Sequence, residues 1–160
     1  MNSQRFGLAT CKFLLTVAGL GLLLLGLVKL TDQESFLATI HAHGLMPEWS
    51  TTAASYAIPL AESVLGAATL WAITTSNRAT ALAALGLSGF MLLMTIYAAA
   101  LWISPPPVPV SCGCLPNAAP VESWMPITLR NGTIASAAAL IARALINSPA
   151  HTQQARPVTT

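Results

Sequence analysis

The sequence predicts an all-α integral membrane protein built as a four-helix bundle, and three observations support this prediction. Apolar residues make up 54% of the 160 residues and charged residues only 8%, whereas soluble domains carry about 25% charged residues. Apolar runs of roughly 20 residues, the length that crosses the hydrocarbon core of a bilayer, recur along the chain. Basic residues gather at alternate ends of successive runs, as the positive-inside rule requires of membrane spans.

The four expected spans cover residues 13–30, 51–73, 79–103 and 125–146. Residues 1–146 would then form one membrane domain, and residues 147–160 a flexible cytoplasmic tail. The first run follows Arg5 and Lys12, but it is longer than the apolar region of a secretory signal, about 7–15 residues, and no cleavage site follows it. We therefore expect it to be retained as a span. The third run ends at the prolines of residues 105–107, which cannot continue a helix.

The basic residues also predict an orientation with both termini in the cytoplasm. Arg5 and Lys12 lie before or at the start of the first run, Arg78 lies between the second and third runs, and Arg143 and Arg156 close the chain. The other two basic residues, Lys29 and Arg130, lie at span edges. The loops of residues 31–50 and 104–124 would therefore lie outside. The same orientation places three tryptophans at the outer interface, where amphipathic rings prefer to lie: Trp49, Trp102 and Trp124.

The first outer loop contains the pattern of a short helix lying on the membrane surface, between the first two spans. Asp32 is a candidate N-terminal cap, and Gly44 marks the end of the segment. Phe36, Leu37 and Ile40 would share one apolar face at helical spacing. We expect this face to pack over the end of the bundle.

Two of the three cysteines, Cys112 and Cys114, lie one residue apart in the second outer loop. Disulfides persist outside the cytoplasm, and Gly113 supplies the backbone freedom that so small a ring needs. A bridge across one residue would restrict little chain entropy. It would also be strained, and strained exposed disulfides tend to be labile or catalytic. The spacing therefore predicts thiol–disulfide exchange, in which one thiolate forms a mixed disulfide and the other resolves it.

Two alternatives to exchange remain open from the residues alone. Both thiols could stay reduced in a membrane scaffold whose outer loops hold a client without redox chemistry. Alternatively, His41 and His43 in the first outer loop could join the two cysteines as four metal ligands. Because short motifs in separate loops can coincide by chance, we assign no metal site. Cys11, on the cytoplasmic side, is expected to act as a small apolar residue.

Glu62 lies near the middle of the second apolar run, where a carboxylate must be paired or protonated. Lys29 and Arg130 lie near the outer ends of the first and fourth runs, and either could reach Glu62. Such a contact would be a structural link between helices or a site of quinone or proton handling. Arg130 could also favour a thiolate in the nearby loop.

The order of these features resembles the MauE family of methylamine utilisation, which is itself similar to the four-helix DoxX-type membrane proteins. The first run ends in "GLVKLTDQESF", "IPLAESVLGAATL" follows, and "CGC" and "W-x5-RNG" precede the last run. The resemblance extends over about residues 5–145. The chain departs from the family after the cysteine pair, where Leu115-Pro116 replaces an aromatic residue and a glycine, so the shape of this loop stays open.

The resemblance implies a multi-pass protein of the bacterial inner membrane, active in the maturation of an exported, disulfide-containing client. Methylamine dehydrogenase is the client associated with MauE. The implied partners are a thioredoxin-like periplasmic protein, the client and the lipid bilayer. The formal charge of +2 gives no indication of a nucleic-acid partner. The sequence identifies no cofactor, keeps a quinone as a candidate electron acceptor, and leaves open whether the chain is an enzyme or one component of an exchange system.

Overall fold

The computed structural model describes residues 2–114 and 119–147, and these ranges contain helices and no strand. The helices are α1 (Asn2–Thr31), α2 (Gln33–His43), α3 (Glu48–Thr75), α4 (Asn77–Ile103) and α5 (Met125–Asn147). The all-α class predicted from the sequence is confirmed for the described residues. The expected cytoplasmic tail lies outside them, apart from Asn147.

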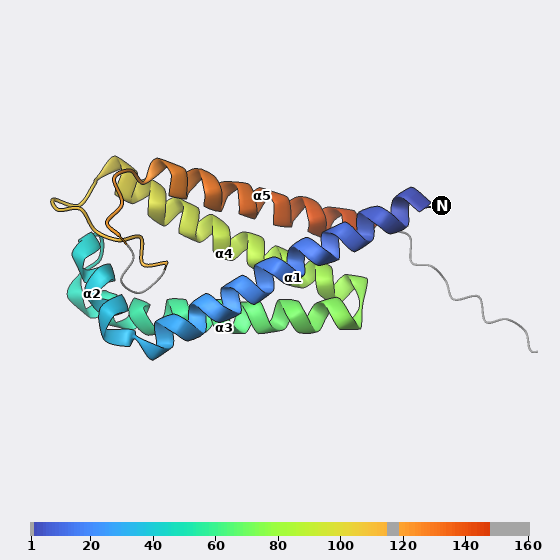
Figure 1. Cartoon of the computed structure of the whole chain (residues 1–160), viewed down its shortest axis with the longest axis horizontal. Coiled ribbons are helices and arrows are strands. Elements are labelled where there is room, and N and C mark those ends of the chain that lie inside the picture. Colours follow the sequence, from blue (N-terminus) through green and yellow to red (C-terminus); the bar gives the residue numbers. More distant parts are fainter. Residues whose placement is uncertain (1, 115–118, 148–160) are drawn as a thin grey trace, which may run out of the picture.

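The four long helices form two packed pairs, α1 with α3 and α4 with α5, and the pairs meet where α3 lies against α4. Figure 1 shows α1 crossing the bundle obliquely, while α4 and α5 run side by side. Ser76 alone separates α3 from α4, and its hydroxyl oxygen accepts a hydrogen bond from the Ala79 N–H at the start of α4. At the opposite end of the bundle, α2 lies near the segment that joins α4 to α5.

Three helical segments are long and apolar enough to cross a bilayer: Gly7–Thr31, Glu48–Thr75 and Asn77–Ile103. Each contains one expected span and continues beyond it, because helical hydrogen bonding does not stop where the apolar run stops. Large apolar side chains on the long helices, such as Phe13, Leu60 and Leu92, are exposed, as lipid-facing residues would be. The chain is therefore a multi-pass helical membrane protein. A span formed by α5, which carries Arg130 and Arg143, stays a prediction.

Glycines allow α1 and α3 to approach each other closely. A Cβ atom added to Gly66 would lie 2.5 Å from the backbone nitrogen of Leu23 and 2.6 Å from the carbonyl oxygen of Gly19. Gly26 is similarly close to the backbone of Pro59. Only residues without side chains permit this backbone separation, which brings the charged residues farther along the two helices into contact.

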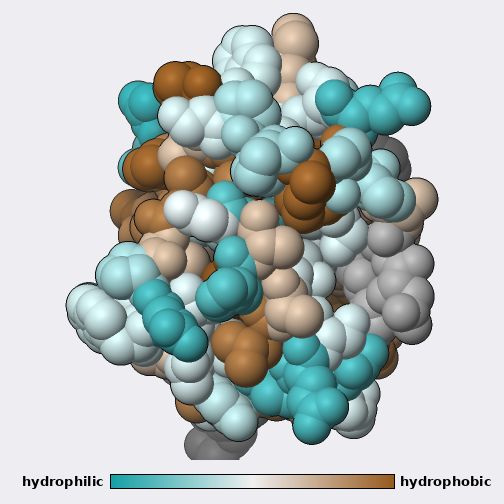
Figure 2. Space-filling model, turned by 90° about the vertical axis from the view of Figure 1, so that its left-hand side faces the viewer, coloured by the Kyte–Doolittle hydropathy of each residue, from teal (hydrophilic) through white to brown (hydrophobic). Residues whose placement is uncertain are grey.

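The short helix expected between the first two spans is present as α2, with two differences from the prediction. The side chain of Asp32 makes no capping hydrogen bond, while Gly44 ends the helix in the left-handed conformation with φ of 67°. Phe36 and Ile40 are buried as predicted, but Leu37 is only partly buried. Figure 2 shows this end of the molecule, where hydrophilic side chains are spread among smaller apolar patches.

The three tryptophans expected at one interface all lie at the end of the bundle that carries α2, but they differ in burial. Trp49 and Trp102 are 78% and 51% exposed, whereas Trp124 is 6% exposed. The ring of Trp124 contacts the imidazole of His43 edge to face, with centroids 5.1 Å apart. Trp124 is therefore part of the protein interior rather than an interfacial anchor.

Candidate functional site

A cavity of about 130 Å³ lies among the helices near α2 and the cysteine loop. Its walls come from all five helices and from residues 112–114, and most of the lining side chains are apolar. The candidate site residues that the sequence indicated all line it: Lys29, Glu62, Cys112, Cys114 and Arg130. The fold thus gathers side chains from α1, α3, α5 and a loop around one space.

Glu62 is paired with Lys29 and not with Arg130. The Lys29 ammonium nitrogen lies 2.6 and 2.9 Å from the two carboxylate oxygens of Glu62, and both side chains are less than 10% exposed. The same nitrogen lies 5.0 Å from the centre of the Phe36 ring, within the range of a cation–π contact. The pair joins α1 to α3 in the region where their backbones are close.

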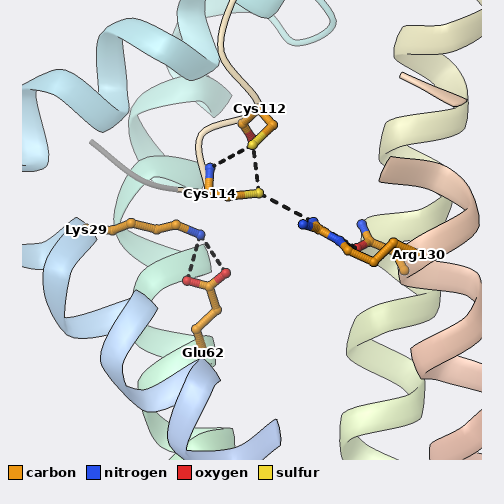
Figure 3. Close-up of polar contacts among 6 residues, drawn as sticks. Lys29, Glu62, Cys112, Cys114 and Arg130 are labelled. Atoms are coloured by element: carbon orange, nitrogen blue, oxygen red, sulfur yellow. Dashed lines mark hydrogen bonds and ion pairs between the residues drawn. The ribbon is translucent and has the colours of Figure 1, made fainter. Parts of the chain in front are cut away.

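The two cysteines occupy a tight turn centred on Gly113, whose φ is 66°. The backbone N–H of Cys114 donates a hydrogen bond to the sulfur of Cys112 at 3.3 Å, and the sulfur of Cys114 lies 3.9 Å from the Cys112 carbonyl oxygen. Both cysteines are free thiols and partly buried. The conformation expected of Gly113 is therefore present, and it turns both sulfurs toward the same space (Figure 3).

Arg130 reaches the cysteine turn from α5. Its Nη2 atom lies 3.5 Å from the sulfur of Cys114, and Figure 3 shows the two side chains pointing toward each other. The buried Asn131 orients the guanidinium group, because its Oδ1 atom accepts hydrogen bonds from Arg130 Nε at 3.3 Å and from Nη2 at 3.2 Å. Arg130 itself is exposed, so it lies at the rim of the cavity.

This arrangement shifts the pKa values of the two thiols in opposite directions. A hydrogen bond from the Cys112 side chain, followed by the nearby Arg130, holds the pKa of Cys114 well below its ordinary value, although burial acts in the opposite direction. The same interaction with Cys114 and burial raise the pKa of Cys112. The site can therefore present one thiolate, at Cys114, beside one protonated thiol.

His43 holds the cysteine loop in place, a role that the sequence analysis did not predict. Its Nε2 atom lies 3.0 Å from the carbonyl oxygen of Ser111, and its Nδ1 atom lies 2.7 Å from the Tyr97 hydroxyl oxygen. Burial lowers the pKa of His43, which favours the neutral ring. Because a carbonyl oxygen can only accept, Nε2 carries the proton and Nδ1 accepts from Tyr97. The residue directly before Cys112 is thus tied to α2 and, through His43, to α4.

The structure does not bring together the four candidate metal ligands. His41 is exposed and lines a different pocket, beside Glu34 and Glu48, while both ring nitrogens of His43 already have partners. Within residues 2–114 and 119–147, no three side chains of the metal-binding types are close enough to hold an ion. Residues two apart on a helix do not share a face, which separates His41 from His43.

These features define a class: a multi-pass helical membrane protein with paired thiols, a buried ion pair and an arginine around one cavity. The chain belongs to the MauE family, because the family model described as "Methylamine utilisation protein MauE" matches residues 7–144. The resemblance found in the sequence is therefore confirmed. Family membership indicates a role in methylamine utilisation. No curated protein and no solved structure matches the chain.

Proposed function

We propose that this protein exchanges disulfides with exported proteins during their maturation, with Cys112 and Cys114 as the exchanging pair. The observation that carries the proposal is the position of both sulfurs in one turn, with Arg130 Nη2 3.5 Å from Cys114. A thiolate is the attacking species in exchange, and a second thiol within the same turn can resolve the mixed disulfide. A structural bridge would gain little from so short a loop.

In this proposal the chain crosses the bacterial inner membrane four times and keeps both termini in the cytoplasm. Support for the fourth span comes from α5, which packs along α4 and exposes Leu129 and Leu140. Its 23 residues correspond to about 34 Å of helix, enough to cross the hydrocarbon core. Arg78 lies in the first turn of α4, at the end of the bundle opposite the cysteine loop. The positive-inside rule then assigns that loop to the periplasm.

The proposed partners are a thioredoxin-like periplasmic protein and an exported client that contains disulfides. Both would reach the thiols from the end of the bundle that carries α2, where polar side chains are spread over the surface (Figure 2). The chain would then be one component of an exchange system within the bilayer. A quinone is a candidate for the final electron acceptor of that system, and the exchange step itself does not require one.

The redox state of the cysteines in intact cells tests this proposal. A membrane-impermeant maleimide should label Cys112 and Cys114 only after reduction, whereas Cys11 should require a permeant reagent. The Cys11→Ser variant is the matched control and should behave as the wild type. Labelling of Cys112 only by permeant reagents would contradict the orientation. Retention of client maturation in the Cys112→Ser/Cys114→Ser variant would contradict exchange and favour a scaffold without redox chemistry.

A further inference from the structure

Among the charged side chains that the structure describes around the cavity, Lys29 and Glu62 form an ion pair, whereas Arg130 faces no carboxylate. Lys29 and Glu62 neutralise each other at 2.6 Å. Arg130 has no carboxylate partner among residues 2–114 and 119–147, and its side-chain hydrogen bonds go to the neutral Asn131 and to the sulfur of Cys114. Cys114, when it is a thiolate, is therefore the anion that compensates Arg130.

This compensation depends on the redox state of the cysteines. In the reduced protein, Cys114 can carry a negative charge beside the guanidinium group. In a Cys112–Cys114 disulfide neither sulfur is charged, and Arg130 loses its counter-ion. Arg130 is exposed at the rim of the cavity, so solvent screens part of its attraction to the thiolate, but that attraction exists only in the reduced form. Arg130 therefore stabilises the reduced form more than the oxidised form.

We propose that Arg130 makes the Cys112–Cys114 disulfide a stronger oxidant, which accepts electrons from client thiols at Cys112 and releases Cys114 as the leaving thiolate. This inference rests on the proposed exchange function and adds its direction and the role of each sulfur. Stabilisation of the reduced form raises the reduction potential of a dithiol pair. The lowered pKa of Cys114 supports the assignment, since a thiol of lower pKa is the better leaving group.

A client thiolate attacks the sulfur of Cys112, so that a client–Cys112 bond forms, the Cys112–Cys114 bond breaks and Cys114 leaves as a thiolate beside Arg130. The second client thiol loses its proton and attacks the client sulfur of the mixed disulfide. Cys112 leaves and takes up a proton to become a thiol. The client loses two electrons and gains a disulfide, and the pair gains the same two electrons.

The redox equilibrium of the purified full-length protein with glutathione tests the contribution of Arg130. The Arg130→Gln variant should have an equilibrium constant for reduction about fivefold lower than the wild type, as expected for a charge pair at a partly exposed site. Arg130→Lys keeps the charge and should lie between the two. Arg143→Gln removes an exposed arginine elsewhere on α5 and should match the wild type. An unchanged constant in an Arg130→Gln protein that still forms the disulfide would overturn this inference and leave exchange intact.

The role of each sulfur is tested on the wild-type protein, so this measurement does not depend on a variant that folds. Oxidised protein is mixed briefly with reduced glutathione, quenched with N-ethylmaleimide and analysed by mass spectrometry of the loop peptide. We expect glutathione on Cys112 and maleimide on Cys114. Glutathione on Cys114, or equally on both sulfurs, would overturn the assignment. Failure of the wild type to form any Cys112–Cys114 disulfide would instead contradict the proposed exchange function itself.

Discussion

Lys29 with Glu62 and Arg130 with Cys114 are two charge pairs at the same cavity. They differ in burial and in whether their charges depend on the redox state of the cysteines. Lys29 and Glu62 are both buried and form an ion pair that links α1 to α3. Arg130 and Cys114 lie at the rim, and their attraction depends on the charge of a sulfur that is lost when a disulfide forms. The first pair suits a structural link between helices, and the second suits a redox site. We therefore expect the buried pair to act mainly on stability and Arg130 on the redox equilibrium, to which Lys29 adds a smaller attraction for the Cys114 thiolate.

The largest effect is expected from breaking only one side of the buried pair. Lys29→Met should lower the free energy of unfolding by about 3–5 kcal/mol, because the Glu62 carboxylate is left buried without a partner. The Lys29→Met/Glu62→Leu variant should recover most of that loss, since apolar packing can replace a buried ion pair. Unfolding by denaturing detergent in mixed micelles measures both. A double variant as unstable as Lys29→Met would show that apolar packing cannot replace this ion pair as a link between the two helices.

Gly113→Ala tests the turn that brings the two sulfurs together. An alanine with the left-handed φ of 66° costs about 1–2 kcal/mol, and its Cβ would lie 3.3 Å from the Phe36 ring. We expect the rate of disulfide closure to fall about tenfold, as measured by alkylation at timed intervals. Gly44→Ala is the matched control, because Gly44 has the same conformation and open space around it. It should cost similar stability without slowing closure.

The pH dependence of the redox equilibrium shows whether Cys114 is a thiolate while Cys112 stays protonated. Two glutathione thiols supply the protons when they reduce the pair, so one proton is released if Cys114 ends as a thiolate. Above the lowered pKa of Cys114 and below the raised pKa of Cys112, the equilibrium constant for reduction by glutathione should therefore rise about tenfold per pH unit. Below the pKa of Cys114 both sulfurs keep their protons, and the constant should not change with pH. Titrations against a glutathione buffer measure the slope. A constant that does not change through neutral pH would show that Cys114 is not a thiolate there.

The smallest expected effect is a change in the free energy of unfolding that depends on redox state. It should be seen for the Arg130–Cys114 pair and not for the Lys29–Glu62 pair. Arg130→Gln should destabilise the reduced protein by about 1 kcal/mol, the upper range for a partly exposed charge pair, and leave the oxidised protein unchanged. Arg143→Gln should change neither state. Unfolding in mixed micelles with and without a reductant gives the two values. Equal destabilisation in both states would mean that Arg130 acts through Asn131 or packing rather than through the thiolate.

Much of the site was predictable because its signals are local. The spacing of Cys112 and Cys114 requires a turn at Gly113, and a carboxylate in an apolar run requires a partner. The choice of partner was not predictable from the sequence, since Lys29 and Arg130 were both near enough along their helices to reach Glu62. The histidines were misleading in the metal hypothesis, although their separation by two residues on a helix already indicated different faces.

The sequence by itself determined the helical membrane class, the approximate positions of the three apolar helical segments, the surface helix and the family, because hydropathy, periodicity and short motifs are properties of neighbouring residues. The tertiary structure decided which distant residues meet. Lys29 pairs with Glu62 across 33 positions, Arg130 with Cys114 across 16, and His43 with Ser111 across 68. These contacts depend on how closely α1 and α3 approach at their glycines and on the way each helix is turned in the bundle. The close approach of α1 to α3 and the rotation of each helix result from the packing of whole helices against one another. Neither is encoded in a single segment of the sequence.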